Sequence, residues 1–321
     1  MDFLANYFGS LNPMSFLSAL PGNIAQGIIW GLMGLGVFLT FKLLNFADLS
    51  VDGSFATGGA VTAVMLINGW PVWATIIVAI LAGLAAGLVT GLLHTLLGIP
   101  DILAGILTQI ALYSINLNIM GKSNLPISYR NYTLVVSASN INMAILVGLG
   151  ICAVVVAAMY WYFGTEQGST IRSTGSNPAM SKAQGININF TKVIALALSN
   201  GLVALSGSLF AQYQGFADIN MGRGAIVIGL AAVIIGEVLG EAIFRKHMNF
   251  IIRMLFVIVG GILYYIAMGI VLWLKMPTDD TKLFTAIIVA IFLAVPYLQK
   301  KRKTSFKKVA KMNAKNAQKE G

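Results

Sequence analysis

Two aspartates four residues apart, Asp48 and Asp52, lie in a polar stretch between apolar segments. On a helix, residues at this spacing share a face, so the two carboxylates would lie on one side. At membrane depth such a pair could line the path of a polar solute or bind a coupling cation, because ionisable groups there usually face a cavity or a partner. Alternatively, the two residues cap the ends of half-helices, since Asn, Asp and Ser are preferred N-cap residues. The neighbouring candidates for the same path are Asn45, Ser50 and Ser54.

Uncharged polar side chains mark two later apolar segments and form a second candidate set. These are Gln109 and Asn116 in the segment 101–120, and Asn200 and Gln212 in the segment 190–213. Uncharged hydrogen-bonding groups suit a low-affinity path on which a polar solute binds and then leaves. Hydrogen bonding between helices is an equally good explanation for any one of them.

The residue types that catalysis or metal binding would need are scarce in this sequence. His94 and His247 have no partner at metal-ligand spacing, and no G-x-x-x-x-G-K-[ST] phosphate loop occurs. The single cysteine, Cys152, lies within an apolar run, which is typical of core packing. We therefore expect no catalytic residue, no metal and no cofactor on this chain. If ATP drives its work, another chain must bind the nucleotide.

The composition indicates a membrane protein. The chain has 321 residues, of which 57% are hydrophobic and 10% charged, and its mean hydropathy is +0.82. Segments such as 141–163 and 250–274 are apolar on every face, which argues for helices that span the bilayer and against an outer-membrane barrel. The expected fold is therefore an all-α, polytopic transmembrane bundle.

Breakers and charges divide the chain into nine expected spans, within a membrane domain at 22–298. Residues 1–21 form either a helix on the outer surface or a first, broken span, which would make ten. The polar stretch Asn45–Ser54 predicts a discontinuous helix, because irregular backbone at membrane depth must be surrounded by protein or water. The spans are expected at 22–42, 54–68, 71–98, 101–120, 141–163, 190–213, 223–240, 250–274 and 282–298.

The net charge of +10 is concentrated at the C-terminus, where nine of the 21 Lys and Arg follow Gln299. This basic tail, 299–321, is typical of a cytoplasmic end attracted to anionic lipid headgroups, and it lacks the aromatic interleaving that would favour nucleic acid. With the tail inside, nine spans place 16 of the 21 basic residues on the inner side, in agreement with the positive-inside rule.

Glycines at a spacing of four predict tight helix packing. Gly83, Gly87 and Gly91 share one helix face, and Gly27 and Gly31 repeat the spacing in the first span. Small residues at this spacing let a neighbouring backbone approach closely. The pattern indicates packing and carries no information about function.

A polar segment on the inner side, 164–186, interrupts the apolar spans. Within it, Asn177 and Pro178 form a helix start, Ala179 to Gln184 can form two turns, and Gly185 is a stop signal. The sequence therefore predicts a short, capped helix at the membrane surface. It is either a docking element for a partner or only a connector.

The same segment carries a family resemblance. The run from Arg172 to Ile186 resembles the R-A-x-G-x-N-x-x-A-A-x-x-x-G-I coupling-helix signature of ABC importer permeases of the branched-chain amino acid and ribose type. Further matches extend from about Gly27 to Gly240, and the run Asn45–Phe55 is similar to permeases of tryptophan/tyrosine uptake systems. The residues that the resemblance assigns to ATPase coupling, within 172–185, are Arg172, Ser173, Gly175, Asn177, Pro178, Ala179 and Gly185. Ser173 and Ser181 depart from the alanines usual in the signature.

The resemblance implies a type II-like permease subunit, itself not an enzyme, in the cytoplasmic membrane of a bacterium. It implies a second permease copy, two cytoplasmic ATPases that bind ATP and Mg²⁺, and an extracytoplasmic solute-binding protein. The expected solute is an amino acid, most closely an aromatic one, and the alternatives are a nucleoside, a sugar or a branched-chain amino acid. A secondary transporter coupled to an ion gradient is the alternative from a different class.

Overall fold

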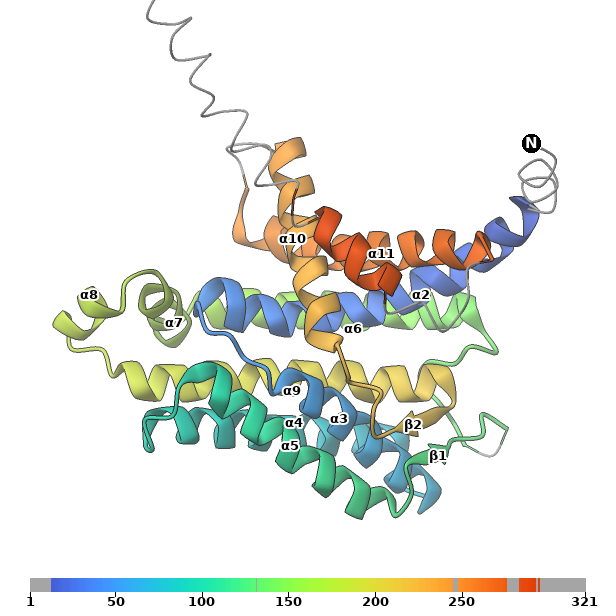
Figure 1. The fold of residues 1–321 in the computed structure, drawn as a ribbon, viewed down its shortest axis with the longest axis horizontal. Coiled ribbons are helices and arrows are strands. Elements are labelled where there is room, and N and C mark those ends of the chain that lie inside the picture. Colours follow the sequence, from blue (N-terminus) through green and yellow to red (C-terminus); the bar gives the residue numbers. More distant parts are fainter. Residues whose placement is uncertain (1–12, 131, 245–247, 276–282, 293, 295–321) are drawn as a thin grey trace, which may run out of the picture.

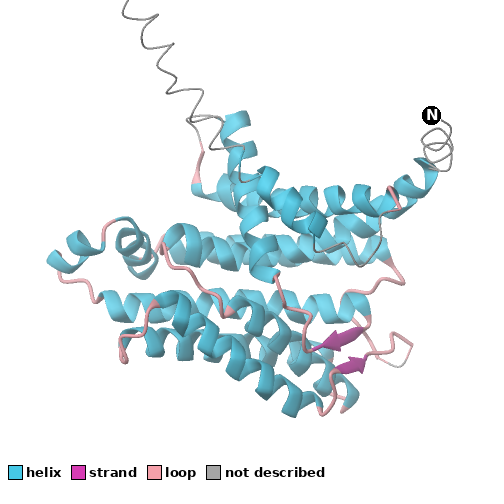
Figure 2. Cartoon of the chain, in the orientation of Figure 1, coloured by secondary structure: helices cyan, strands magenta, loops and turns pink. Residues whose placement is uncertain are grey.

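The computed structural model describes residues 13–130, 132–244, 248–275, 283–292 and 294, and most of this part of the chain is helical. Two short strands, β1 (Asn124–Pro126) and β2 (Phe216–Asp218), pair antiparallel with Asn124 opposite Asp218 (Figure 2). The helices are α2 (Pro13–Val37), the π-helix η1 (Phe38–Leu43), α3 (Val51–Ile67), α4 (Val72–Thr95), α5 (Asp101–Met120), α6 (Ile141–Phe163), α7 (Glu166–Ser176), α8 (Pro178–Ala183), α9 (Ile188–Gln214), α10 (Ala225–Phe244) and α11 (Phe250–Trp273).

Seven helices of the described part are long and apolar enough to span a bilayer, which confirms a polytopic helical membrane protein. They correspond to seven of the nine expected spans, and the bounds of α5 and α6 agree with the expected ranges. The remaining two ranges fall on shorter apolar helices, α3 with 17 residues and Leu283–Phe292. Part of the expected last span and the tail 299–321 lie outside the described residues.

The first long helix begins earlier than expected. Helix α2 starts at Pro13 and passes through Pro21 without a break, so the boundary expected at residue 21 does not separate two elements. Proline lacks the amide hydrogen, so α2 loses one backbone hydrogen bond at Pro21, the ninth residue of the helix, which is only partly buried. Residues 1–12 lie outside the described part.

Most of the long helices run side by side along the horizontal axis of the view, whereas α10 crosses them steeply (Figure 1). Helices α7 and α8 lie at the left-hand end of that view, and the two strands lie at the opposite end. Helices α2 and α9 are the most buried of the long helices and form the centre of the bundle. The end that carries α7 and α8 corresponds to the side expected to face the cytoplasm.

The glycine pattern packs helices together as predicted. A Cβ on Gly83 or Gly87 of α4 would overlap the carbonyl oxygen of Asn200 or Leu196 on α9. On α2, a Cβ on Gly31 would lie 2.8 Å from the Cα of Ile258 on α11. Such close backbone approach between neighbouring helices is what small residues at a spacing of four permit.

The predicted break after the first span is present. Helix α2 widens into the π-helix η1, and residues 44–50 are irregular before α3 begins at Val51. Asn45 has a φ of 56°, a left-handed conformation that asparagine tolerates better than most residues. Because α3 starts only after this break, it has 17 residues and begins within the bundle (Figure 1).

Candidate functional site

Four predicted path residues meet in a buried hydrogen-bond network between the break and helix α9. The side-chain amide of Asn200 donates to the carboxylate of Asp48 over 2.7 Å, and its oxygen accepts a hydrogen bond of 2.6 Å from the Ser54 hydroxyl. The Ser50 hydroxyl lies 2.5 Å from the other carboxylate oxygen of Asp48. All four side chains are at most 2% exposed. The network therefore fixes the irregular segment and the start of α3 to the centre of the bundle.

Asp48 also accepts a hydrogen bond of 2.9 Å from the backbone amide of Ser50, the N-cap residue of α3. With its amide and hydroxyl partners, its carboxylate has donors on both oxygens, as a buried charge requires. Asp48 therefore holds the turn before α3 in place but is not the N-cap residue of this helix.

Asp52 is the second residue of α3 and joins this helix to a second one. Its two carboxylate oxygens accept hydrogen bonds from the backbone amides of Gly224 (2.9 Å) and Ile226 (2.8 Å) at the start of α10. A helix N-terminus has unpaired amide groups and a partial positive charge, so a carboxylate stabilises it. Asp52 is thus an N-terminal cap for α10 supplied by another helix, and it is also part of a cavity wall.

The cavity beside Asp52 has a volume of about 330 Å³ and lies between the start of α3, the middle of α5 and the segment before α10. Three predicted path residues, Asp52, Gln109 and Asn116, line it. Asn116 is fully buried, and neither its amide nitrogen nor its carbonyl oxygen has a hydrogen-bond partner in the described part of the chain. The other lining residues are Gly53, Ala56, Ile110, Tyr113, Ile219 and Arg223.

Two cavity residues, Arg223 and Tyr113, did not emerge from the sequence as path candidates. The guanidinium carbon of Arg223 lies 5.9 Å from the ring centroid of Tyr113, a cation–π geometry. The signal available in the sequence was the pair Gly222 and Gly224, which flank Arg223 before an apolar helix. A Cβ on Gly222 would overlap the backbone oxygen of Asp52, so the tight approach of this turn brings Arg223 to the cavity.

Two other predicted path residues lie elsewhere. Asn45 is exposed in the turn after η1 and is absent from the cavity wall. Gln212 is buried near the other end of α9, where its side-chain oxygen accepts a hydrogen bond of 3.0 Å from the amide of Val135. The structure therefore divides the nine predicted residues into a buried network, a cavity wall and two separate positions.

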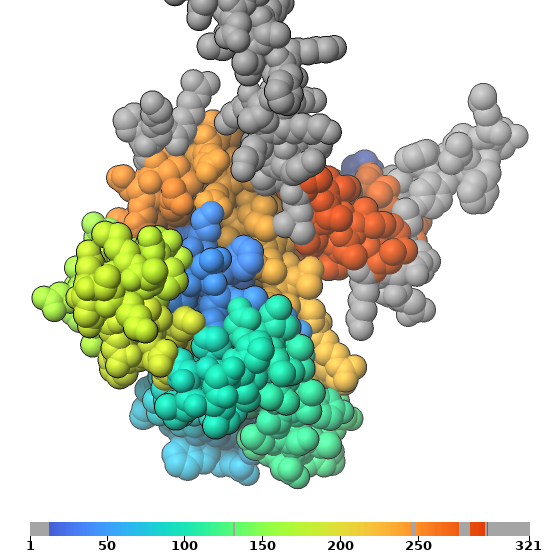
Figure 3. Space-filling view, turned by 60° about the vertical axis from the view of Figure 1, so that its left-hand side comes forward, coloured from blue at the N-terminus to red at the C-terminus, as the bar shows by residue number. Residues whose placement is uncertain are grey.

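The predicted short helix on the inner side is present as α8. The side chain of Asn177 accepts a hydrogen bond of 3.0 Å from the amide of Met180, Pro178 is the first helical residue, and Gly185 has a φ of 83°. The N-cap residue Asn177 is exposed, and so is every residue of α8 except Ser181. In Figure 3 the yellow-green surface of α7 and α8 projects beside the blue surface of the first helix.

Residues 166–176 form helix α7, which was not predicted from the sequence, because the predicted short helix began only at Asn177. Residues such as Gly168 have a low helix propensity, so the sequence carries no helix signal here. The helix is stabilised by tertiary contacts instead. A Cβ on Gly168 would overlap the backbone of Tyr162 and Phe163, and a Cβ on Gly175 would overlap the carbonyl oxygen of Leu43. Helix α7 therefore packs closely on the end of α6 and on η1.

Two predicted coupling residues on α7, Arg172 and Ser173, make hydrogen bonds inside the protein. The guanidinium group of Arg172 donates to the carbonyl oxygen of Phe163 over 3.0 Å, and its carbon lies 5.8 Å from the ring centroid of Phe250. The Ser173 hydroxyl donates to the carbonyl oxygen of Thr170 within α7. Of the seven predicted coupling residues, Asn177, Pro178, Ala179 and Gly185 are on the exposed α8 segment, and Arg172, Ser173 and Gly175 are on α7.

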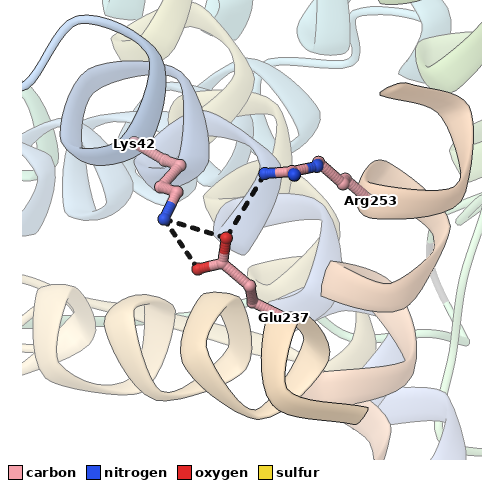
Figure 4. A network of polar contacts seen from close by, with 3 residues as sticks. All are labelled: Lys42, Glu237 and Arg253. Atoms are coloured by element: carbon pink, nitrogen blue, oxygen red, sulfur yellow. Dashed lines mark hydrogen bonds and ion pairs between the residues drawn. The ribbon is translucent and has the colours of Figure 1, made fainter. Parts of the chain in front are cut away.

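A cluster of charges connects η1 with α10 and α11 near the same end (Figure 4). The Lys42 ammonium lies 2.8 Å from a carboxylate oxygen of Glu237, and the guanidinium group of Arg253 lies 3.4 Å from the same oxygen. The three side chains are between 24% and 40% exposed. The cluster links the π-helix to the helix that Asp52 caps at its other end.

The sequence match that decides the family covers residues 22–296. This segment matches the family described as branched-chain amino acid transport system / permease component. The chain belongs to this family of permeases. The family predicted from the sequence is thereby confirmed, and the chain is a membrane permease subunit of the ABC transporter type.

Individual relatives of this permease agree with the family. It is 42% identical, over 93% of its length and 99% of the relative's, to a tyrosine transport system permease protein of Clostridioides difficile. It is 25% identical, over 80% of its length and 77% of the relative's, to the D-allose transport system permease protein AlsC of Escherichia coli. Among solved structures, a chain of PsaBC from Streptococcus pneumoniae in complex with Fab has a TM-score of 0.51, with 16% identity, 91% of this permease covered and 94% of that chain.

Proposed function

We propose that this permease forms the membrane path of an ATP-driven importer for an aromatic amino acid, tyrosine or tryptophan. The observation that supports this solute is the 42% identity to a tyrosine transport permease across almost its whole length. A D-allose permease is a more distant relative at 25% identity, which makes a sugar the second candidate. A nucleoside or a branched-chain amino acid would fit the same machine.

Energy for import comes from a partner ATPase that binds ATP and Mg²⁺ and docks on α8. The supporting observation is that α8 is exposed on nearly all sides while the adjoining α7 packs closely on η1 through Gly175. A rigid, anchored helix can transmit the movement of a partner, whereas a mobile connector would absorb it. The movement would pass from α7 to η1, and from there to the break that precedes α3.

The complete transporter contains this permease, a second copy of it, two cytoplasmic ATPases and an extracytoplasmic solute-binding protein. The binding protein docks at the end that carries β1 and β2, opposite α7 and α8 (Figure 1). The arrangement is of type II, in the cytoplasmic membrane of a bacterium and with the C-terminus in the cytoplasm. Membrane lipid surrounds the apolar outer faces of α4, α5 and α6, whose side chains are largely exposed.

The docking of the ATPase on α8 is tested with the doubly substituted variant Asn177→Ala, Gly185→Leu. We expect the loss of the cap and the strain at a positive φ to distort α8 and to reduce both ATPase assembly and uptake by about tenfold or more. Co-purification of the partner ATPase and ATP-dependent uptake in proteoliposomes measure the two effects. Asn118→Ala, an exposed position on α5, is the control. Unchanged assembly and uptake would refute the assignment of α8.

The solute and the energy source are tested with the complete transporter. Calorimetric titration of the solute-binding protein is expected to show binding of tyrosine or tryptophan. Binding of D-allose or a nucleoside, with no response to either aromatic amino acid, would contradict the proposed solute. Uptake that needs an ion gradient while ATP is present, or that proceeds without the ATPase, would instead indicate a secondary transporter.

A further inference from the structure

The cavity of about 330 Å³ beside α3 combines groups of three chemical kinds. It has a carboxylate from Asp52, a guanidinium group from Arg223, and an aromatic ring from Tyr113 among apolar neighbours. Ligand sites in proteins are mostly apolar cavities of about this size or larger, with a few polar groups that fix orientation. The composition of this wall is that of a binding site for a small amphiphilic molecule with both charges.

The cation is available to a ligand. Within the described part of the chain, the guanidinium group of Arg223 forms no ion pair, whereas Glu237 pairs with Lys42 and Arg253. Its backbone is fixed, because the amide of the next residue, Gly224, donates to Asp52 over 2.9 Å. Its side chain lies over the Tyr113 ring. A guanidinium group held in this way can bind a carboxylate through two parallel hydrogen bonds.

The carboxylate of Asp52 can accept further hydrogen bonds. Each carboxylate oxygen of Asp52 accepts one backbone amide, and a carboxylate offers about four acceptor positions in all. Its other two positions can accept hydrogen bonds from an ammonium group in the cavity. Asp52 and Arg223 therefore present opposite charges to one small volume without forming an ion pair with each other.

Asn116 provides an independent sign of a ligand. Its side chain is fully buried in the cavity wall, yet both its donor and its acceptor lack partners in the described residues. A buried amide without hydrogen bonds is destabilising, and in native proteins such groups need an explanation. A hydroxyl or an N–H group on a bound molecule would satisfy it.

We infer that this cavity binds the amino acid during its passage, with Arg223 holding the α-carboxylate, Asp52 the α-ammonium group and Tyr113 the aromatic ring. Asn116 would then bind the polar atom of the side chain, the phenol hydroxyl of tyrosine or the indole N–H of tryptophan. The inference rests on the proposed function, since it takes an aromatic amino acid as the solute. It adds a specific site on the permease itself, separate from any selectivity of the binding protein.

The experiment uses the full-length permease in lipid nanodiscs, without ATPase or binding protein, and saturation-transfer NMR, which detects weak binding. Tyrosine is compared with tyramine, which lacks the carboxylate, and with 3-(4-hydroxyphenyl)propionate, which lacks the ammonium group. We expect ring signals from tyrosine and at least about tenfold weaker affinity for the two analogues, because each loses a charged hydrogen-bonded contact. Equal affinity for all three would overturn the inference, and this comparison needs no variant.

Substituted variants then test which side chains of the cavity bind tyrosine. Arg223→Gln is expected to weaken tyrosine binding about tenfold, Arg223→Lys to restore part of it, and Asn116→Leu to weaken it as well. The matched control is Asn118→Leu, two residues away on α5 but exposed. Tyrosine binding that is unchanged in both Arg223→Gln and Asn116→Leu would overturn the assignment. Failure of the proposed function is separate, because it appears as absent ATP-dependent uptake by the wild-type transporter.

Discussion

A Cβ on Gly175 would overlap the carbonyl oxygen of Leu43, so helix α7 lies directly on the last turn of the π-helix η1. No side chain separates the two backbones at this point. π-Helical turns are rare in proteins, and those that occur are often found at functional sites. The contact joins the exposed α8 segment to the break that carries Asp48, and it is thus a connection between the end that carries α7 and α8 and the candidate site.

Substitution of Gly175 by alanine should separate α7 from η1. We expect the stability to fall by about 1–3 kcal/mol, as in other overpacked contacts, and ATP-driven uptake to fall although the ATPase still binds. Thermal unfolding in detergent and uptake in proteoliposomes measure the two quantities. Gly150→Ala on α6 is the matched control, since a Cβ there meets nothing within 4 Å. Full uptake by Gly175→Ala would show that the contact does not transmit movement.

Asn200 holds the buried network together, so Asn200→Ala should destabilise the protein strongly. The substitution removes the donor to Asp48 and the acceptor for Ser54, leaving a buried carboxylate with one donor fewer. We expect a loss of about 3 kcal/mol, read from thermal or denaturant unfolding. Asn118→Ala, at an exposed position, should cost little. In the double variant with Asp48→Ala, the losses should be clearly less than additive, and strict additivity would contradict a coupled network.

Asp52→Ala should loosen the start of α10, a helix that is remote in sequence. Loss of a cap costs about 1 kcal/mol, which corresponds to roughly fivefold faster hydrogen exchange. The faster exchange is expected at the amides of Gly224 and Ile226 and can be followed by mass spectrometry. Asp101→Ala is the control, because among the described residues Asp101 bonds only the amide of its neighbour Ile102. Equal protection of α10 in both variants would exclude the cap.

Glu237→Gln should weaken the link between η1, α10 and α11 only slightly. Its partners Lys42 and Arg253 are 40% and 37% exposed, so water screens the ion pairs and the expected loss is about 1 kcal/mol or less. The difference in unfolding temperature from the wild type should shrink as salt is added. Glu241→Gln, exposed and without an ion pair in the described residues, should show no such salt dependence. A salt-independent difference would point to packing instead.

Signals from neighbouring residues in the sequence were sufficient to predict most of the long helices and the short helix α8. The segment 101–120 is bounded by Pro100 and by Gly121, which has a φ of 65°, and both are helix-end signals readable in the sequence. Asn177 and Pro178 likewise indicate the start of α8. Helices whose ends are determined by neighbouring residues could therefore be predicted from the sequence.

The parts that were missed depend on contacts between distant segments. Helix α7 contains Gly168 and Gly175, which weaken an isolated helix but permit the close packing that stabilises it. The cavity joins Tyr113 to Arg223, 110 positions later, and no periodicity relates them. The division of the two aspartates, one in a network and one at a cavity, also depends on which helix lies opposite each.

The buried network around Asn200 also restricts how this protein can change during evolution. Asp48, Ser50, Ser54 and Asn200 bond one another, so a single replacement leaves at least one of the remaining buried groups with a hydrogen-bond partner fewer. Neutral drift at these positions is therefore expected to occur in concert. A homologue that has lost the amide at the position of Asn200 should also have lost the carboxylate at the position of Asp48, even when the two chains have diverged little elsewhere.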